Sequence, residues 1–355
     1  MLGKRKLIVD VNCGLRKELA EISDETFYNF QKQTIEPDAV YVIGYNETVK
    51  NVDKIKQLAN TEIAQFIFSN PVEGSQTILN HCGNIGILDL IKQQKILLLT
   101  GGDVAPEYPH LTYDNFLPKV LDYNENIDAI QQYRDTYSTD RPYKFLFLNG
   151  QQRHHRKFMI HALGDLLDSA LWTNLDTGNG PIKLLDQYYE HAKFNVNFQT
   201  NDKNVKSKLF GNGIWGDVLL SVRQYSDTYF SLVTETVHNY PYSFRTEKIW
   251  KPVAIGHPWI AVANRGFYRD MHNLGFQTFG HAIDESFDLI DNDQDRLRRV
   301  ADIVKDLCQQ DLAGFLNECY NVCKYNQQHL ADMRLKVRSE FSKRFEQFIT
   351  TYINE

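Results

Sequence analysis

Residues 229–263 read YFSLVTETVHNYPYSFRTEKIWKPVAIGHPWIAVA, and this stretch determines how the rest of the chain is interpreted. Residues 229–234 form a short run rich in apolar and β-favouring side chains, and 259–263 form a second one. Between them, 247–255 have the composition and spacing of a short helix. A strand, a helix and a strand in this order predict a βαβ unit, which pairs its strands in parallel.

The same alternation continues outward in both directions. Further strands are predicted at 144–149 and 170–173, around a helix at 153–167. The N-terminal half has three apolar runs of strand length, separated by stretches with helical spacing. The runs are 6–11, 39–43 and 95–99, and the helical stretches are 15–33, 50–60 and 77–93. We therefore expect parallel sheets throughout an α/β protein.

A chain of 355 residues is too long for a single ordinary core, since cores stop growing at about 250 residues. Prolines punctuate residues 104–143 up to Pro142, which favours a linking region there. We expect two Rossmann-like domains, 1–142 and 143–355, that face each other across a cleft. Most residues after Asp293 favour helix, and we expect these C-terminal helices to brace the domains.

Composition narrows the functional classes. Apolar residues make up 42% and charged residues 24%, as in globular proteins. The net charge of −6 argues against a protein whose main task is to neutralise nucleic-acid phosphates. The apolar runs fall far short of the roughly 20 residues needed to cross a bilayer. Five cysteines, an odd number, suit reduced thiols, so the prediction is a cytoplasmic protein.

The start of the helix at 247–255 has the features of an anion site. The Thr246 hydroxyl can cap the first turn, whose free N–H groups and positive dipole end favour phosphate. Arg245, Lys248 and Lys251 add positive charge, and the Glu247 carboxylate can accept hydrogen bonds from two adjacent ribose hydroxyls. The alternative is a well-capped helix with an acidic first turn and an ordinary buried face.

Three motifs in this stretch resemble α-1,3-fucosyltransferase-like enzymes. They are Val-Thr-Glu-Thr at 233–236, Phe-Arg-Thr-Glu-Lys at 244–248 and Gly-His-Pro at 256–258, within a resemblance that covers roughly 143–300. It implies that Glu247 binds the donor ribose and that Lys248 lies beside the diphosphate, with Glu235 and Tyr242 as further donor contacts. The turn at 234–239 and Arg245 depart from the family pattern, which leaves the sugar open.

A second polar segment, 149–156, follows a predicted strand and opens a helix. The resembled family has an Asn-rich turn with an arginine here, which makes Asn149, Arg153 and Arg156 candidate donor contacts, because guanidinium groups suit phosphate geometry. Alternatively, the two arginines are solvated helix charges. The adjacent histidines 154 and 155 point about 100° apart on a helix and form no ligand pair, so no metal is predicted.

An inverting transfer needs a base near the acceptor hydroxyl, which we expect from the N-terminal domain. Asp103 follows the strand at 95–99 after two glycines that would let backbone and ligand approach each other. Glu107 and Glu73 are rival candidates. Each of the three carboxylates can also be explained as the capping acid of a turn.

The resemblance implies an inverting, metal-independent glycosyltransferase. Its co-substrate is a nucleotide-diphosphate sugar, with GDP-linked sugars among the candidates, and its acceptor is a saccharide or lipid-linked saccharide. One alternative is a phage-type enzyme that glycosylates hydroxymethylated cytosine in DNA. Another is a non-catalytic nucleotide or glycan binder on the same fold. The base, the sugar and the oligomeric state stay open.

Overall fold

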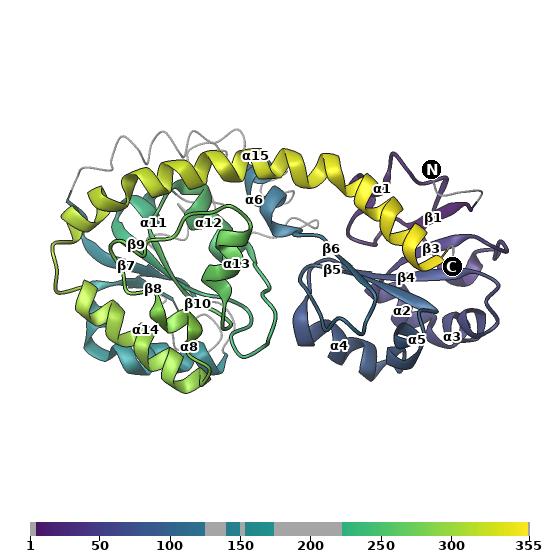
Figure 1. Ribbon diagram of the computed structural model, residues 1–355, viewed down its shortest axis with the longest axis horizontal. Helices are drawn as coiled ribbons and strands as arrows, with labels where there is room; N and C mark the ends of the chain where they lie inside the picture. Colours follow the sequence, from purple (N-terminus) through teal and green to yellow (C-terminus); the bar gives the residue numbers. More distant parts are fainter. Residues whose placement is uncertain (1–4, 125–139, 150–152, 174–221, 354–355) are drawn as a thin grey trace, which may run out of the picture. The chain divides into compact units, whose positions relative to one another are not determined.

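A computed structural model of the chain describes residues 5–124, 140–149, 153–173 and 222–353 (Figure 1). The chain divides into two compact units. Unit 1 comprises Met1–Asn115, Tyr240–Phe244 and Leu335–Glu355, and unit 2 comprises Phe116–Asn239 and Arg245–Arg334. The border after residue 115 precedes the expected one at 142, and two later segments of the chain return to unit 1.

The described part of unit 1 contains a six-stranded sheet in the order β2-β1-β3-β4-β5-β6, with every pair parallel. The strands are β1 (Leu7–Asp10), β2 (Glu25–Phe27), β3 (Val40–Gly44), β4 (Gln65–Asn70), β5 (Ile96–Thr100) and β6 (His110–Thr112). The strands predicted at 6–11, 39–43 and 95–99 are confirmed. The prediction lacked the central strand β4.

Helices cover both faces of this sheet. Successive strand residues point to opposite sides, so the apolar strands have two apolar faces to bury. Tyr41 and Phe66 belong to one apolar cluster, with residues of α3 (Val52–Asn60), α4 (Ser75–Asn84) and α5 (Leu88–Lys92). Val42 and Ile67 belong to the other, with residues of α1 (Arg16–Leu19) and the C-terminal turns of α15 (Leu312–Ile353). A short helix, α2 (Tyr45–Lys50), directly follows β3.

The helix predicted at 15–33 is wrong. Only α1 is helical there, and it is followed by β2 and a 3-10 turn at Phe30–Lys32. β2 pairs in parallel with β1, and the rings of Phe27 and Phe30 pack on each other and on Tyr41. Burial of these aromatic rings against the sheet outweighs the local helical spacing.

The described part of unit 2 contains a parallel four-stranded sheet in the order β10-β9-β7-β8. Its strands are β7 (Tyr143–Phe147), β8 (Leu171–Trp172), β9 (Thr228–Thr234) and β10 (Trp259–Val262), each within a predicted run or one residue beyond it. The chain passes from β7 to β8 on one side and later adds β9 on the other side of β7. The order of the described strands therefore reverses between β7 and β9.

Helices lie on both faces of this second sheet (Figure 1). α8 (His154–Leu163) and α14 (Asp293–Leu307) cover one face, and α11 (Val222–Ser226) and α12 (Glu247–Ile255) cover the other, with α6 (Phe116–Asn124) against α12. A further helix, α13 (Phe267–Asn273), follows β10. Both units thus have the layered, parallel architecture of Rossmann-like folds, and the prediction of an α/β protein is confirmed at this level.

The 42-residue helix α15 contributes to both units. In unit 2, Gln327 donates a hydrogen bond to the backbone carbonyl of Ala254 at 3.1 Å, beside the C-terminal end of α12. In unit 1, Phe341 and Phe345 are fully buried in the core. Within the described ranges, no helix is both long and apolar enough to cross a membrane.

Candidate functional site

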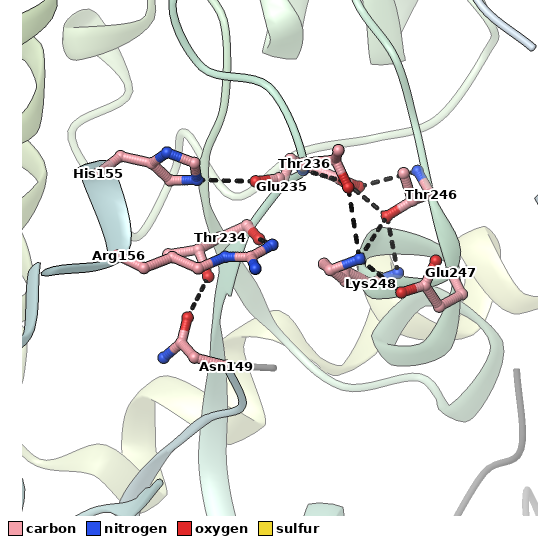
Figure 2. A network of polar contacts seen from close by, with 9 residues as sticks. All are labelled: Asn149, His155, Arg156, Thr234, Glu235, Thr236, Thr246, Glu247 and Lys248. Atoms are coloured by element: carbon pink, nitrogen blue, oxygen red, sulfur yellow. Dashed lines mark hydrogen bonds and ion pairs between the residues drawn. The ribbon is translucent and has the colours of Figure 1, made fainter. Parts of the chain in front are cut away.

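Polar side chains gather where the strand order of unit 2 reverses. Asn149 lies two residues after β7, and Glu235 directly follows β9. The Asn149 Oδ1 atom accepts a hydrogen bond of 2.7 Å from the hydroxyl of Thr234, which joins the carboxyl ends of the two strands (Figure 2). Open α/β sheets bind ligands at this kind of position, outside the carboxyl ends of strands at a reversal.

The start of α12 lies beside the end of β9. Thr246 is the N-cap of this helix, and its hydroxyl accepts a hydrogen bond from the backbone N–H of Lys248 at 3.4 Å. Glu247 is the first helical residue, and Gly256 closes the helix in the left-handed conformation that favours glycine. The expected helix at 247–255 is confirmed at both ends.

Glu247 and Lys248 form an ion pair on this first turn, with 2.5 Å between the Lys248 Nζ and Glu247 Oε1 atoms (Figure 2). Glu247 is only 7% exposed. Burial raises the pKa of its carboxyl, but the charge and hydrogen bond of Lys248, together with the charge of Lys251 and a backbone hydrogen bond, bring the pKa below its ordinary value. The Glu247 side chain is therefore a carboxylate at neutral pH, so both of its oxygens can accept hydrogen bonds from ribose hydroxyls.

The side chain of Glu235 lies inside unit 2. The residue is 0% exposed. Its Oε1 atom accepts a hydrogen bond from the Thr246 N–H at 3.0 Å, and Oε2 accepts one from the Thr246 hydroxyl at 2.6 Å and one from the Thr236 N–H at 3.1 Å. Burial raises the pKa of this carboxyl, and the charge of Lys248 acts in the opposite direction. The carboxylate thus binds the cap of α12.

The basic segment at the start of α8 faces the end of β9. The Arg156 Nη2 atom donates to the Thr234 carbonyl at 3.2 Å, and His155 Nε2 lies 2.8 Å from the Glu235 carbonyl. Both side chains are buried, so the alternative of a solvated charge is wrong for Arg156. Burial and the charge of Arg153 lower the pKa of Arg156 to about 10, and it stays a cation at neutral pH.

His155 is neutral at neutral pH, because burial and its stacked neighbour His238 lower its pKa to about 3. A carbonyl oxygen can only accept, so Nε2 carries the hydrogen and donates it to Glu235. The only sequence feature that points to this contact with Glu235 is the place of His155 in the polar segment 149–156, directly before Arg156. Sequence reasoning assigned no role to His155 or Thr234.

The N-terminus of α8 suits an anion better than that of α12. Its N-cap residue, Arg153, makes no side-chain capping hydrogen bond, and its first turn contains no acidic residue. The Asn149 Nδ2 atom is buried and has no hydrogen-bond partner among the described residues. By contrast, α12 begins with a side-chain cap and an acid. Residues 150–152 of the predicted turn lie outside the described residues.

The remaining donor candidates fall in different units. Arg245 is buried in unit 2, directly before the Thr246 cap, whereas Tyr242 is half-buried in the segment that belongs to unit 1. A hollow of about 320 Å³ in unit 1 is lined by residues that include Gln65, the first residue of β4, and Lys95, directly before β5. This hollow contains none of the predicted site residues.

The three candidate bases all lie in unit 1. Glu73 follows β4 and Asp103 follows β5, and the Gly101 N–H donates to the Glu73 carbonyl at 2.6 Å. The structure therefore brings these two loops together at one edge of the sheet. Asp103 is exposed and accepts a hydrogen bond of 2.7 Å from the Thr112 hydroxyl, Glu107 is exposed, and Glu73 is half-buried.

A buried carboxylate that the sequence analysis overlooked lies at the strand reversal of unit 1, between β1 and β3. Asp10 is fully buried at the end of β1 and accepts hydrogen bonds from the backbone N–H groups of Asn12 and Gly44 at 2.9 and 3.1 Å. In the sequence, the feature that could have identified this site is an aspartate directly after the apolar run 7–9.

Among the residues that the structure describes, no group of three or more His, Cys, Asp or Glu residues is placed to hold a metal ion. No protein-family model, curated protein or solved structure matches this chain.

Proposed function

We propose that the chain is a glycosyltransferase that binds a nucleoside-diphosphate sugar on unit 2 and transfers the sugar to a hydroxyl acceptor. The observation that supports this most is the pair Glu247–Lys248 at the start of α12, beside the strand reversal between β7 and β9. A carboxylate for hydroxyl groups and an ammonium for phosphate occur together where an open α/β sheet binds its ligand.

The diphosphate has two sources of stabilisation in this proposal. The first-turn N–H groups of α8, whose N-cap side chain makes no capping hydrogen bond, and the Arg153 and Arg156 guanidinium groups supply one, and the Lys248 ammonium supplies the other. Fixed cations near a departing diphosphate can take the place of a divalent ion, which is the basis for proposing a metal-independent transfer.

The transfer proposed is inverting. The acceptor hydroxyl attacks the anomeric carbon, the bond from this carbon to the diphosphate oxygen breaks, and the hydroxyl proton passes to a base. The candidates for this base are the unit 1 carboxylates Asp103, Glu107 and Glu73. A GT-B arrangement, in which unit 1 carries the acceptor and this base, is part of the proposal.

A thermal-shift panel of GDP-, UDP-, ADP- and CMP-sugars tests the proposal. The matching donor should raise the melting temperature of the wild-type protein, because a ligand that binds only the folded state stabilises it. Release of the free nucleotide in the presence of mixed saccharide acceptors then distinguishes a transferase from a binding protein. No shift with any of the four donors would contradict the proposal.

A further inference from the structure

We propose that Glu235 is a positioning residue that holds the first turn of α12 in place for the donor and does not itself touch the donor. This inference rests on the proposed function. It assigns to Glu235 a role different from the direct donor contact that the sequence resemblance implies.

The two carboxylate oxygens of Glu235 are both engaged with protein groups. Oε1 accepts from the Thr246 N–H, and Oε2 accepts from the Thr246 hydroxyl and the Thr236 N–H, at distances of 2.6 to 3.1 Å (Figure 2). The residue is fully buried. A donor contact would require one of these oxygens to give up its buried hydrogen bonds, which is costly because the buried N–H and O–H donors would lose their acceptor.

The bond between Glu235 and Thr246 also determines where the hydroxyl proton points. A threonine hydroxyl has one hydrogen and two acceptor lone pairs. Since the Lys248 N–H and ammonium can only donate to the Thr246 oxygen, the Thr246 hydrogen is directed at Glu235. The lone pairs of Thr246 are then available to accept from the Lys248 N–H at 3.4 Å and from the Lys248 Nζ at 3.3 Å.

Glu235 is itself held from the other side. The neutral His155 ring donates to its backbone carbonyl at 2.8 Å, and the Arg156 guanidinium donates to the carbonyl of the preceding Thr234. These two hydrogen bonds fix the end of β9 to α8. The Glu235 side chain in turn holds the cap of α12 against this fixed end of the strand. Glu247 and Lys248 follow the cap directly, so their placement depends on Glu235.

Two substitutions separate positioning from simple stability. Glu235→Gln keeps the shape but replaces one acceptor oxygen by an NH₂ donor, which conflicts with the hydrogen of Thr246. Thr246→Val keeps the shape and removes the hydroxyl. Asp288→Asn is the matched control, because Asp288 is another buried carboxylate of unit 2 that accepts backbone hydrogen bonds, from Tyr268 and Arg269.

The measurements are hydrogen exchange of the backbone amides of residues 246–250 and calorimetric titration with GDP, or with UDP, ADP or CMP if GDP does not bind. Glu235→Gln and Thr246→Val should each accelerate exchange in this turn and weaken nucleotide binding by about tenfold or more. The double variant should resemble the single ones, because both changes break one chain of contacts. Thr246→Ser should restore the wild-type values, and Asp288→Asn should leave both readouts near wild type.

The outcomes distinguish this inference from the proposed function. If none of the four nucleotides binds to the wild-type protein, the proposed function fails, and hydrogen exchange alone decides whether Glu235 holds α12. If a nucleotide binds to the wild-type protein and equally well to Glu235→Gln, the positioning role is refuted. Unchanged exchange in residues 246–250 of Glu235→Gln refutes it as well.

Discussion

The ring of Phe244 lies so close to Gly101 that a Cβ atom added to this glycine would come within 2.9 Å of the phenylalanine Cε2 atom. The backbone carbonyl oxygen of Pro71 would lie nearer still, at 2.3 Å. All three residues belong to unit 1. The glycine at this turn therefore makes room for the protein itself, whereas the sequence predicts that Gly101 and Gly102 allow a ligand to approach.

Substitution of Gly101 by alanine should destabilise the protein by about 1–3 kcal/mol, the usual effect of overpacking, because the Pro71 backbone cannot easily yield. Gly83→Ala is the control. It lies inside helix α4, where a Cβ would meet only the end of the Leu88 side chain, at 3.2 Å, and its effect should stay within about 1 kcal/mol. Urea denaturation of both variants measures this difference, and equal stabilities would contradict the packing argument.

Capping signals in the local sequence were enough to predict both ends of α12. Thr246 caps it, Glu247 complements the dipole of its first turn, and Gly256 followed by Pro258 stops it. The strand β2 was mistaken for helix because its pairing with β1 is a tertiary interaction that no local pattern contains.

In the candidate site, too, the sequence predicted what depends on neighbouring residues and missed what depends on tertiary contacts. Residue types at the helix start identified Glu247 and Lys248 as candidates. The inward orientation of Glu235 depends on Thr246, which is 11 residues further along the chain, and was not predictable from the motif. The assignment of residues 240–244 to unit 1 likewise follows from packing, because Phe244 belongs in sequence to the stretch that leads into α12.

A matching nucleoside diphosphate should raise the melting temperature in the absence of added divalent metal, and EDTA should leave this shift intact. The physical reason is that the Arg153, Arg156 and Lys248 cations and the N–H groups of α8 are proposed to stabilise the diphosphate. Thermal-shift assays with EDTA, and with Mg²⁺ or Mn²⁺ added, check this. Stabilisation that appears only with a divalent ion would contradict the proposed arrangement.

The stability of the protein should fall as the pH decreases below about 6.5, partly because of His257. Burial, with the charge of Arg141, lowers the pKa of His257 to about 3. Its neutral ring bonds to the Ser231 hydroxyl and the Thr228 carbonyl. Between the unfolded pKa of about 6.5 and the folded one, the unfolded state binds more protons, so stability is lost towards acid by up to about 1.4 kcal/mol per pH unit.

The measurement is the free energy of unfolding in urea from pH 7 to pH 4, for the wild-type protein and for His257→Gln. The variant should be less stable at pH 7, since it loses a buried hydrogen-bonded ring, and it should depend less steeply on pH. His155 and His238, whose pKa values burial also lowers, to about 3 and about 4, leave the variant some pH dependence. Equal slopes in the two proteins would show that His257 is not buried in its neutral form.

Glu247→Gln and Lys248→Met should impair donor use in different ways. Glu247 is proposed to bind ribose before and during the reaction, so its loss should mainly raise the donor KM, by about 1.5–3 kcal/mol for charged hydrogen bonds. Charge develops on the diphosphate as the glycosidic bond breaks, so loss of Lys248 should also lower kcat.

Glutamine is the better replacement at position 247 because the residue is buried, and a smaller side chain would leave a cavity. The lysine substitution also removes the larger of the two lysine charges that lower the pKa of Glu247, so this pKa should rise. Donor binding by Lys248→Met should consequently improve as the pH rises, because only the ionised Glu247 accepts from both ribose hydroxyls. Steady-state kinetics from pH 6 to pH 9 measure this, with Lys343→Met, an exposed lysine of α15, as control. Wild-type kinetics in both site variants would mean that the Thr-Glu-Lys run is only a well-capped helix, and the function proposed for unit 2 would be abandoned with it.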